Sequence, residues 1–187
     1  MKKIVTFIIA SVFSFTLSAQ KKTAVEPIDL PVDSITNLIT YEEVIEVKGL
    51  KADALYKRTL DWFKTYYKNP TEVIRENDAE KFKIVGKPRF KIYNPADKSG
   101  LKTDAGLVQY TITVAAKDGR FKFEITQYNW KQVSYYACER WMDTKSQTYA
   151  TVYSDYLKQL DQYTQELITN LKNTMQNEKP VKDKDKW

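Results

Sequence analysis

The side chains of this chain that could do chemistry are aromatic and basic rather than nucleophilic. The 187 residues include no histidine and one cysteine, against 13 tyrosines and 4 tryptophans. Histidine is the most frequent general base, and no motif supplies another base that would activate the thiol of Cys138. A lone cysteine is most often a small buried apolar residue. We therefore expect a protein that is not an enzyme.

The aromatic residues of the second half of the chain form a candidate ligand-binding cleft. Rings with one polar edge suit a site for a sugar or an apolar ligand. The same rings also suit a core and its rim, because the tyrosines recur at helical spacing. Both interpretations remain open from the sequence. The candidate residues are Tyr128, Trp130, Tyr135, Tyr136, Trp141, Tyr149 and Tyr153.

Basic residues alternate with apolar ones in the segment KFKIVGKPRFKIY, residues 81–93. On a strand this alternation places the cations on one face, which could dock lipopolysaccharide phosphates, acidic glycans or nucleic acid. A solvated face balanced by Glu42, Glu46 or Glu124 on neighbouring strands is the simpler interpretation. The candidate anion-binding residues are Lys83, Lys87, Arg89 and Lys91.

The acidic residues do not indicate a metal site or a glycosidase. Asp97 and Asp104, or the run from residue 76 to 80, could approach calcium, but neither has the ligand spacing of an EF-hand loop. No pair of carboxylates is marked out for glycoside hydrolysis. We expect neither a metal nor a cofactor.

The first 19 residues, MKKIVTFIIASVFSFTLSA, have the features of an export signal. Two lysines precede an apolar run that ends at Leu-Ser-Ala, and the run is too short for a membrane span. Removing 19 of 187 residues leaves 168, with 28 basic and 24 acidic side chains and a net charge of +4. The cleavage site has no cysteine for a lipid anchor. We expect a periplasmic or extracellular protein, for which nucleic acid is not a partner.

Changes of hydrophobic period predict the secondary structure of the first half of the mature chain. Period two indicates strands and period 3.6 indicates helices, and Gly86 with Pro88 predicts a bulge or an edge position. The expected elements are an extended lead-in at 20–39, strands at 40–48, 71–76 and 81–93, and a helix at 51–68.

A hairpin around Asp118-Gly119 has a register that follows from its apolar residues. A two-residue type I′ loop pairs Lys117 with Arg120. Counting back from the loop then brings the apolar residues together in pairs, which a slip of one residue would destroy. The pairs are Ala116 with Phe121, Val114 with Phe123 and Ile112 with Ile125.

The segment 147–175 is predicted to be one long helix of about 40 Å. Its apolar residues approximate a heptad seam of Tyr149, Tyr153, Tyr156, Leu160, Tyr163 and Leu167. The seam either packs across the sheet or lets a protruding end pair with a second copy or a partner protein. Residues 178–187 are charged, lack a period, and are predicted to be a flexible tail.

These elements give a single α+β domain over residues 40–177, in the order β-α-β-β-β-β-α. One antiparallel sheet should carry both helices on one face. Several segments resemble a family of secreted bacterial domains of unknown function. They are Thr40–Val47, Leu55-Tyr56, Trp62-Phe63, Lys83–Lys87 and Asp118–Phe123, within residues 40–130.

The resemblance implies a fold like that of the TATA-binding protein and a place in the cell envelope. It supplies no activity, ligand or catalytic residue, and the fold does not imply DNA binding. We expect a non-enzymatic module that binds an envelope ligand or protein. The alternative is a structural protein that assembles, as a homo-oligomer or with a partner, through the long helix.

Overall fold

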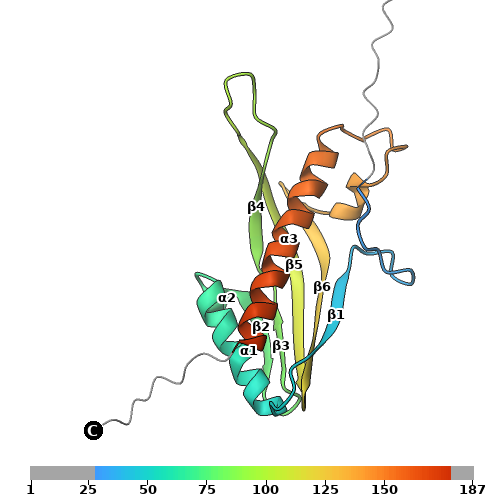
Figure 1. Cartoon of the computed structure of the whole chain (residues 1–187). Coiled ribbons are helices and arrows are strands. Elements are labelled where there is room, and N and C mark those ends of the chain that lie inside the picture. Colours follow the sequence, from blue (N-terminus) through green and yellow to red (C-terminus); the bar gives the residue numbers. More distant parts are fainter. Residues whose placement is uncertain (1–27, 178–187) are drawn as a thin grey trace, which may run out of the picture.

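The computed structural model describes residues 28–177, and these form one sheet with two long helices on one face (Figure 1). The predicted signal peptide 1–19, the lead-in up to residue 27 and the tail 178–187 lie outside the described residues. The strands are β1 (Tyr41–Glu46), β2 (Ile74–Asp78), β3 (Lys83–Gly86), β4 (Arg89–Tyr93), β5 (Asp104–Lys117), β6 (Arg120–Lys131) and β7 (Tyr135–Ala137). The helices are α1 (Ala52–Tyr66), α2 (Pro70–Val73), the 3₁₀ helix η1 (Cys138–Trp141) and α3 (Tyr153–Gln176).

The hairpin of β5 and β6 is the centre of the sheet, and every described pairing is antiparallel. The outer edge of β6 pairs first with β1 and further along with β7. The outer edge of β5 pairs with β3 and β4, and β2 then pairs with β3. Each edge of the hairpin thus carries two short strands in tandem.

The register predicted for this hairpin is confirmed. Lys117 pairs with Arg120, and Ala116, Val114 and Ile112 pair with Phe121, Phe123 and Ile125. The six apolar side chains of these pairs are at most 4% exposed, and they all point to the helix-covered face of the sheet.

A β-bulge in β6 changes which residues point to the helices. The pairing moves from Thr111 with Thr126 to Gln109 with Asn129, so β6 carries one extra residue. Gln127 occupies the bulge with a φ of 55°, a left-handed conformation that few non-glycine residues adopt. Inward positions are odd-numbered up to Ile125, and beyond the bulge the inward position is Tyr128, which is 1% exposed.

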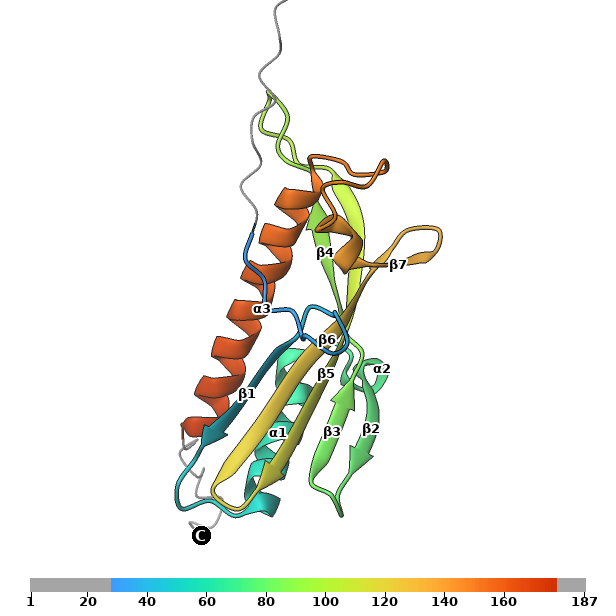
Figure 2. The same ribbon diagram turned by 90° about the vertical axis from the view of Figure 1, so that its right-hand side faces the viewer.

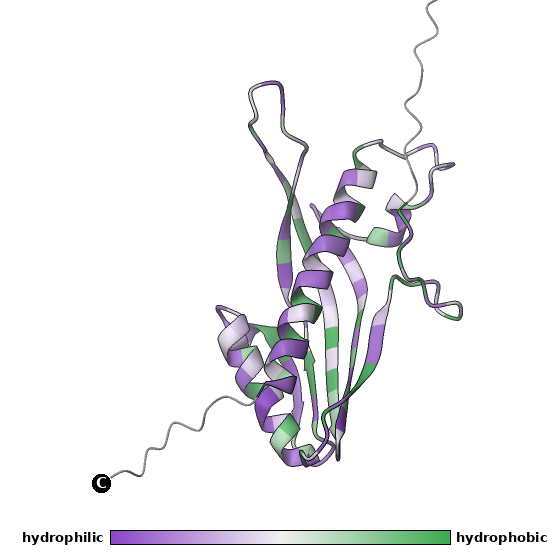
Figure 3. Cartoon of the chain, in the orientation of Figure 1, coloured by the Kyte–Doolittle hydropathy of each residue, from purple (hydrophilic) through white to green (hydrophobic). Residues whose placement is uncertain are grey.

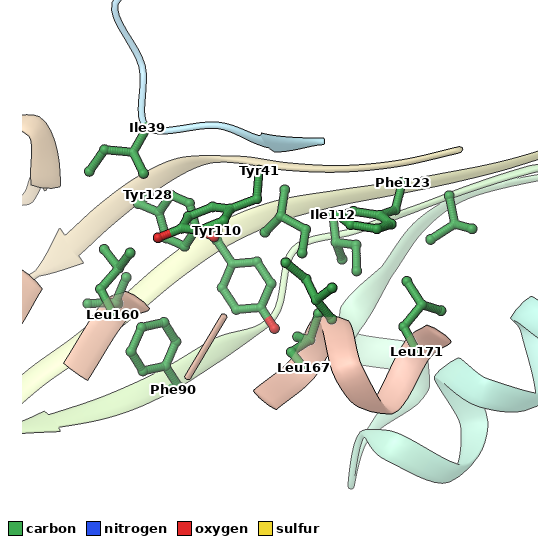
Figure 4. Packing of buried hydrophobic residues seen from close by; sticks show 14 of the residues in the cluster. Ile39, Tyr41, Phe90, Tyr110, Ile112, Phe123, Tyr128, Leu160, Leu167 and Leu171 are labelled. Carbon is green, nitrogen blue, oxygen red and sulfur yellow. The ribbon is translucent and has the colours of Figure 1, made fainter. Parts of the chain in front are cut away.

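Helices α1 and α3 bury their apolar sides against this face, and Figure 4 shows the rings and aliphatic chains that meet there. The helix α1 contributes Leu55, Trp62 and Phe63, each at most 1% exposed. It ends just before Asn69-Pro70, where the proline disfavours helical backbone at the preceding residue. The side of α3 turned away from the sheet is mainly hydrophilic (Figure 3).

The long helix is shorter than predicted and its C-terminal half does not protrude. It begins at Tyr153 rather than at residue 147, because the preceding residues form turns around Ser146 and Thr148. Leu167, Ile168, Leu171 and Met175 are buried. The Trp62 indole donates to Asn170 Oδ1 at 2.8 Å, and the Arg58 guanidinium donates to the Met175 carbonyl at 2.9 Å. The predicted seam therefore packs within the chain, next to α1 (Figure 2).

Two other predicted elements differ from the structure. The strand expected at 71–76 begins only at Ile74, because Pro70 starts the short helix α2 and fixes a helical φ there. The expected strand 81–93 is two strands, β3 and β4, separated at Lys87 and Pro88, so the predicted interruption is confirmed. The aperiodic segment after residue 131 contains β7 and η1, which the sequence did not predict.

Gly86 lets α1 approach the sheet closely. A Cβ atom at this position would lie 2.7 Å from Phe63 Cε1, 3.2 Å from Val73 Cγ1 and 3.3 Å from Ile112 Cγ2. Since Phe63 is itself fully buried, its ring has little room to withdraw.

The substitution Gly86→Ala should therefore lower the free energy of unfolding by about 1–3 kcal/mol, the usual cost of overpacking a core. Urea unfolding followed by circular dichroism measures this loss. Ala115→Val on the opposite, solvent-facing side of β5 is the control and should change stability by less than about 0.5 kcal/mol. Equal stability of Gly86→Ala and wild type would show that α1 is not held this close.

Candidate functional site

A pocket of about 350 Å³ opens where the end of β6, β7, η1 and the start of α3 meet. All four parts of the chain follow the bulge at Gln127 in the sequence. The lining residues are Trp130, Gln132, Val133, Tyr136, Ala137, Arg140, Trp141, Thr148 and Tyr153.

The floor of the pocket is a cluster of aromatic rings. The Trp130 and Trp141 rings meet edge to face with centroids 5.5 Å apart, and Trp141 stacks on Tyr153 at 6.1 Å with an interplanar angle of 28°. Trp141 is 2% exposed, whereas Trp130 and Tyr153 are half-buried. The floor is thus anchored in the core and presents partly accessible rings to the opening.

Trp130 is held in place through the strand β5. Its indole N–H donates to the Ala105 carbonyl at 2.8 Å, and the Gln132 side-chain amide donates to the same oxygen at 3.0 Å. The next residue, Gly106, has a φ of +111°, and a Cβ atom there would lie 2.9 Å from the Lys131 carbonyl oxygen. A glycine is needed because this backbone conformation and this approach both exclude a side chain.

The rim of the pocket combines apolar and polar groups. Val133 is fully exposed, with a relative accessibility of 102%, and Tyr136 is 40% exposed. The Arg140 guanidinium lies over the Tyr136 ring, 5.5 Å from its centroid, and forms no ion pair with a carboxylate of residues 28–177. Together with Thr148 and Gln132 it gives an apolar pocket a few polar handles, the usual composition of a small-molecule site.

The structure brings four of the seven predicted cleft residues together: Trp130, Tyr136, Trp141 and Tyr153. The prediction is wrong for Tyr128, which lies in the core, stacked on Tyr110 at 5.7 Å and hydrogen-bonded to Thr164 at 2.9 Å. Tyr135 points away beside Lys131, because neighbouring residues of β7 face opposite sides. Tyr149 contacts Tyr153 edge to face at 5.8 Å without lining the pocket.

The pocket residues that were not predicted from the sequence include Gln132, Val133, Arg140 and Thr148. They lie in turns and a short strand whose positions depend on the bulge, and their types alone carry no periodic signal. The one local signal was Arg140, a charged residue between Cys138 and Trp141, because a charged residue among apolar ones indicates a position at the surface.

In the structure, two of the four predicted anion-binding residues have a carboxylate partner and two have none within residues 28–177. Lys83 pairs with Glu76 at 2.8 Å and Lys91 with Asp104 at 3.0 Å, so these two lysines are neutralised. The expected partners Glu42 and Glu124 are not involved; Glu42 pairs with Lys122 at 2.6 Å. Lys87 and Arg89 form no ion pair with a carboxylate of residues 28–177, and both line a depression on the far side of β5.

No nucleophile or metal centre accompanies the pocket in the described part of the chain. Cys138 is fully buried beneath it, and burial raises the pKa of its thiol well above the usual value, so the thiol stays protonated at neutral pH. Residues 28–177 hold no cluster of three acidic or cysteine side chains placed to hold a metal ion. None of the described helices is long and apolar enough to cross a membrane.

The role of Gly106 can be tested with Gly106→Ala and the control Gly100→Ala. Both glycines have positive φ, but a Cβ atom at Gly100 meets nothing within 4 Å. Gly106→Ala should therefore cost about 1–3 kcal/mol more than Gly100→Ala. It should also speed hydrogen exchange at the Trp130 indole N–H, measured by NMR with ¹⁵N-labelled tryptophan. Unchanged exchange in Gly106→Ala would contradict this role.

Comparisons with known proteins agree on the fold. A crystal structure of a DUF4468 family protein from Bacteroides ovatus superposes with a TM-score of 0.64 at 14% identity, covering 79% of this chain and 91% of that one. A crystal structure of a TBP-like protein from Parabacteroides distasonis gives 0.58 at 13% identity, covering 76% and 95%. No curated protein matches the chain.

At these identities the two structures bear on the fold alone. The family model of DUF4468, described as a domain of unknown function with TBP-like fold, matches residues 41–131. This range contains β1 to β6 with α1 and α2, and it agrees with the resemblance that the sequence analysis placed at residues 40–130. Residues 41–131 of the chain are thus similar to the DUF4468 family, and the chain has a TBP-like fold.

Proposed function

We propose that this protein is an exported, non-enzymatic module that binds a small molecule in the aromatic pocket beside η1. The pocket itself is the observation that carries the proposal. Its volume of about 350 Å³ falls within the range of small-molecule sites. The ligand would have a flat apolar face for the rings and a hydrogen-bond acceptor or a negative charge for Arg140.

The exposure of the rim supports this proposal. Val133 and Tyr136 hold apolar surface in water at the mouth of the pocket, where a ligand would cover it. The guanidinium of Arg140 has no acidic partner among the described residues and only donates hydrogen bonds. An acceptor on the ligand would satisfy it next to the Tyr136 ring.

The sequence supports export and a role without catalysis. The first 19 residues have the pattern of a cleavable signal, which would place the mature chain in the periplasm or outside the cell. The pocket is lined by aromatic rings, one arginine and neutral polar groups, and it contains no acid–base pair. Such a lining recognises a ligand without transforming it.

Assembly through the long helix has less support. The seam residues Leu160 and Leu167 are at most 1% exposed, and Tyr163 stacks on Phe90 with centroids 4.0 Å apart. A second copy would have to displace these contacts. Native mass spectrometry of the mature protein reports any oligomer and any retained ligand in the same spectrum.

The pocket can be tested by native mass spectrometry and ligand titration on the mature protein from an exporting bacterial host. We expect a retained small molecule in the wild type, because a ligand would cover the partly accessible rings of the floor and the exposed apolar rim. Tyr136→Ala and Arg140→Gln should each reduce retention at least about tenfold, which corresponds to 1.4 kcal/mol. Both side chains are exposed, so the fold should be unaffected.

Tyr135→Ala is the matched control, since Tyr135 is 47% exposed on the same short strand but does not line the pocket. Retention should be unchanged in this variant. A bare polypeptide mass in the wild type, or equal losses in the Tyr135 and Tyr136 variants, would refute binding in this pocket.

A further inference from the structure

The helix α2, the strand β2 and the junction of β3 and β4 lie on the other side of the central hairpin from η1 (Figure 1). A second recess lies among these elements. It consists of two adjoining depressions of about 360 and 390 Å³, which share Asn69, Val73, Pro88 and Arg89. The first also contains Glu72, Arg75 and Lys87, and the second also contains Tyr66, Tyr67, Lys68 and Tyr163. We call this pair of depressions the edge groove.

Backbone hydrogen bonds fix the floor of the edge groove. The Lys87 N–H donates to the Val73 carbonyl at 2.8 Å, which ties the strand junction to the end of α2. The Tyr110 N–H donates to the Pro88 carbonyl at 3.2 Å, which ties the junction to β5. Pro88 is buried between these two bonds, so Lys87 and Arg89 project from a rigid segment.

The edge groove has an uncompensated positive charge. Lys68, Arg75, Lys87 and Arg89 are all exposed, and none forms an ion pair with a carboxylate within residues 28–177. Glu72 is the one acidic residue among those that line it. By contrast, Lys81, Lys83 and Lys91, from the same stretch of sequence, all have carboxylate partners within 3.1 Å. Of the five basic residues between positions 81 and 93, the two that form no ion pair within residues 28–177, Lys87 and Arg89, therefore both lie at this recess.

Tyr66, Tyr67 and Tyr163 form the other wall of the edge groove, and the hydroxyls of Tyr67 and Tyr163 are both linked to Tyr110 in the core. The hydroxyls of Tyr67 and Tyr110 lie 3.2 Å apart, and those of Tyr110 and Tyr163 lie 3.3 Å apart. Burial raises the pKa of Tyr67 and Tyr163, so both hydroxyls stay protonated. Tyr67 is buried, whereas Tyr163 is half-buried, so its hydroxyl is the one of this pair that a ligand could reach.

Two rings of this wall each have one face covered within the protein. Tyr66 stacks on Trp62 with centroids 5.0 Å apart, and Tyr163 stacks on Phe90 at 4.0 Å. These contacts reduce the ring surface on which a nucleobase could stack, and the half-buried Tyr163 hydroxyl adds a polar group to the wall. A ligand rich in hydroxyl groups matches it better than a flat apolar one.

We infer that the edge groove binds an acidic carbohydrate, a sugar that carries a carboxylate or a phosphate group. Arg75, Lys87 and Arg89 would surround the anionic group, while the Tyr163 hydroxyl and the Asn69 side chain would hydrogen-bond the sugar hydroxyls. The guanidinium groups suit either anion, because they match carboxylate and phosphate geometry alike. This site is separate from the aromatic pocket beside η1, which lies across β5 and β6.

The test is an NMR titration of the ¹⁵N-labelled mature protein with glucuronic acid and with glucose 6-phosphate. Glucose and inorganic phosphate serve as probes that have only one of the two recognised features. At least one anionic sugar should shift the amides of Arg75, Lys87 and Arg89, and should bind at least about tenfold more tightly than glucose or phosphate. The stronger of the two identifies the anion as carboxylate or phosphate.

Lys87→Gln combined with Arg89→Gln should reduce the affinity for that sugar at least about tenfold. Lys83→Gln combined with Lys91→Gln is the matched control, because it removes the same charge from lysines that are already paired. Arg140→Gln should have no effect here, so this site and the aromatic pocket can fail independently. Binding of neither sugar, equal binding of inorganic phosphate, or an unchanged affinity in the first double variant would overturn the inference.

Discussion

The antiparallel pairing of β5 with β6 is the constraint on which the other parts of this structure depend. These two strands are the longest of the sheet, and every other strand except β2 pairs directly with one of them. Their register places Ile112, Val114, Phe121 and Phe123 on one face, and both long helices pack on that face. A shift of one residue would turn these side chains to solvent and leave α1 and α3 without a surface to cover.

Because of the bulge at Gln127, the same strand β6 contributes to the closed core before the bulge and to the aromatic pocket after it. Before the bulge, the inward residues of β6 are aliphatic or phenylalanine side chains in a closed core. After it, the inward residues are Tyr128, whose hydroxyl pairs with Thr164 on α3, and Trp130, whose ring lines the pocket. Without the extra residue, Gln127 and Asn129 would point toward the helix instead. The bulge requires an unfavourable left-handed backbone conformation at Gln127, and as a result aromatic side chains point inward at this end of β6.

Some basic residues of the sheet have carboxylate partners and others do not. Lys122, Lys83 and Lys91 are matched by carboxylates on neighbouring segments, as expected for strand faces in water. Lys87 and Arg89 lie where β3 ends and β4 begins, and there the neighbouring backbone is the end of α2 rather than an acidic strand. The interruption by Gly86 and Pro88 therefore brings α1 close to the sheet and also leaves cations unmatched at the edge.

Local patterns in the sequence determined the α+β class, the hairpin register, the helix α1 and the break between β3 and β4. Each of these follows from hydrophobic period, an Asp-Gly turn or a proline, which act over a few residues. The tertiary structure alone decided that Tyr128 belongs to the core, that α3 begins at Tyr153, and that Arg140 joins Trp130 and Trp141 at a pocket. It also decided which lysines have acidic partners. These outcomes depend on a bulge and on contacts between residues far apart in the chain, and no local period records such contacts.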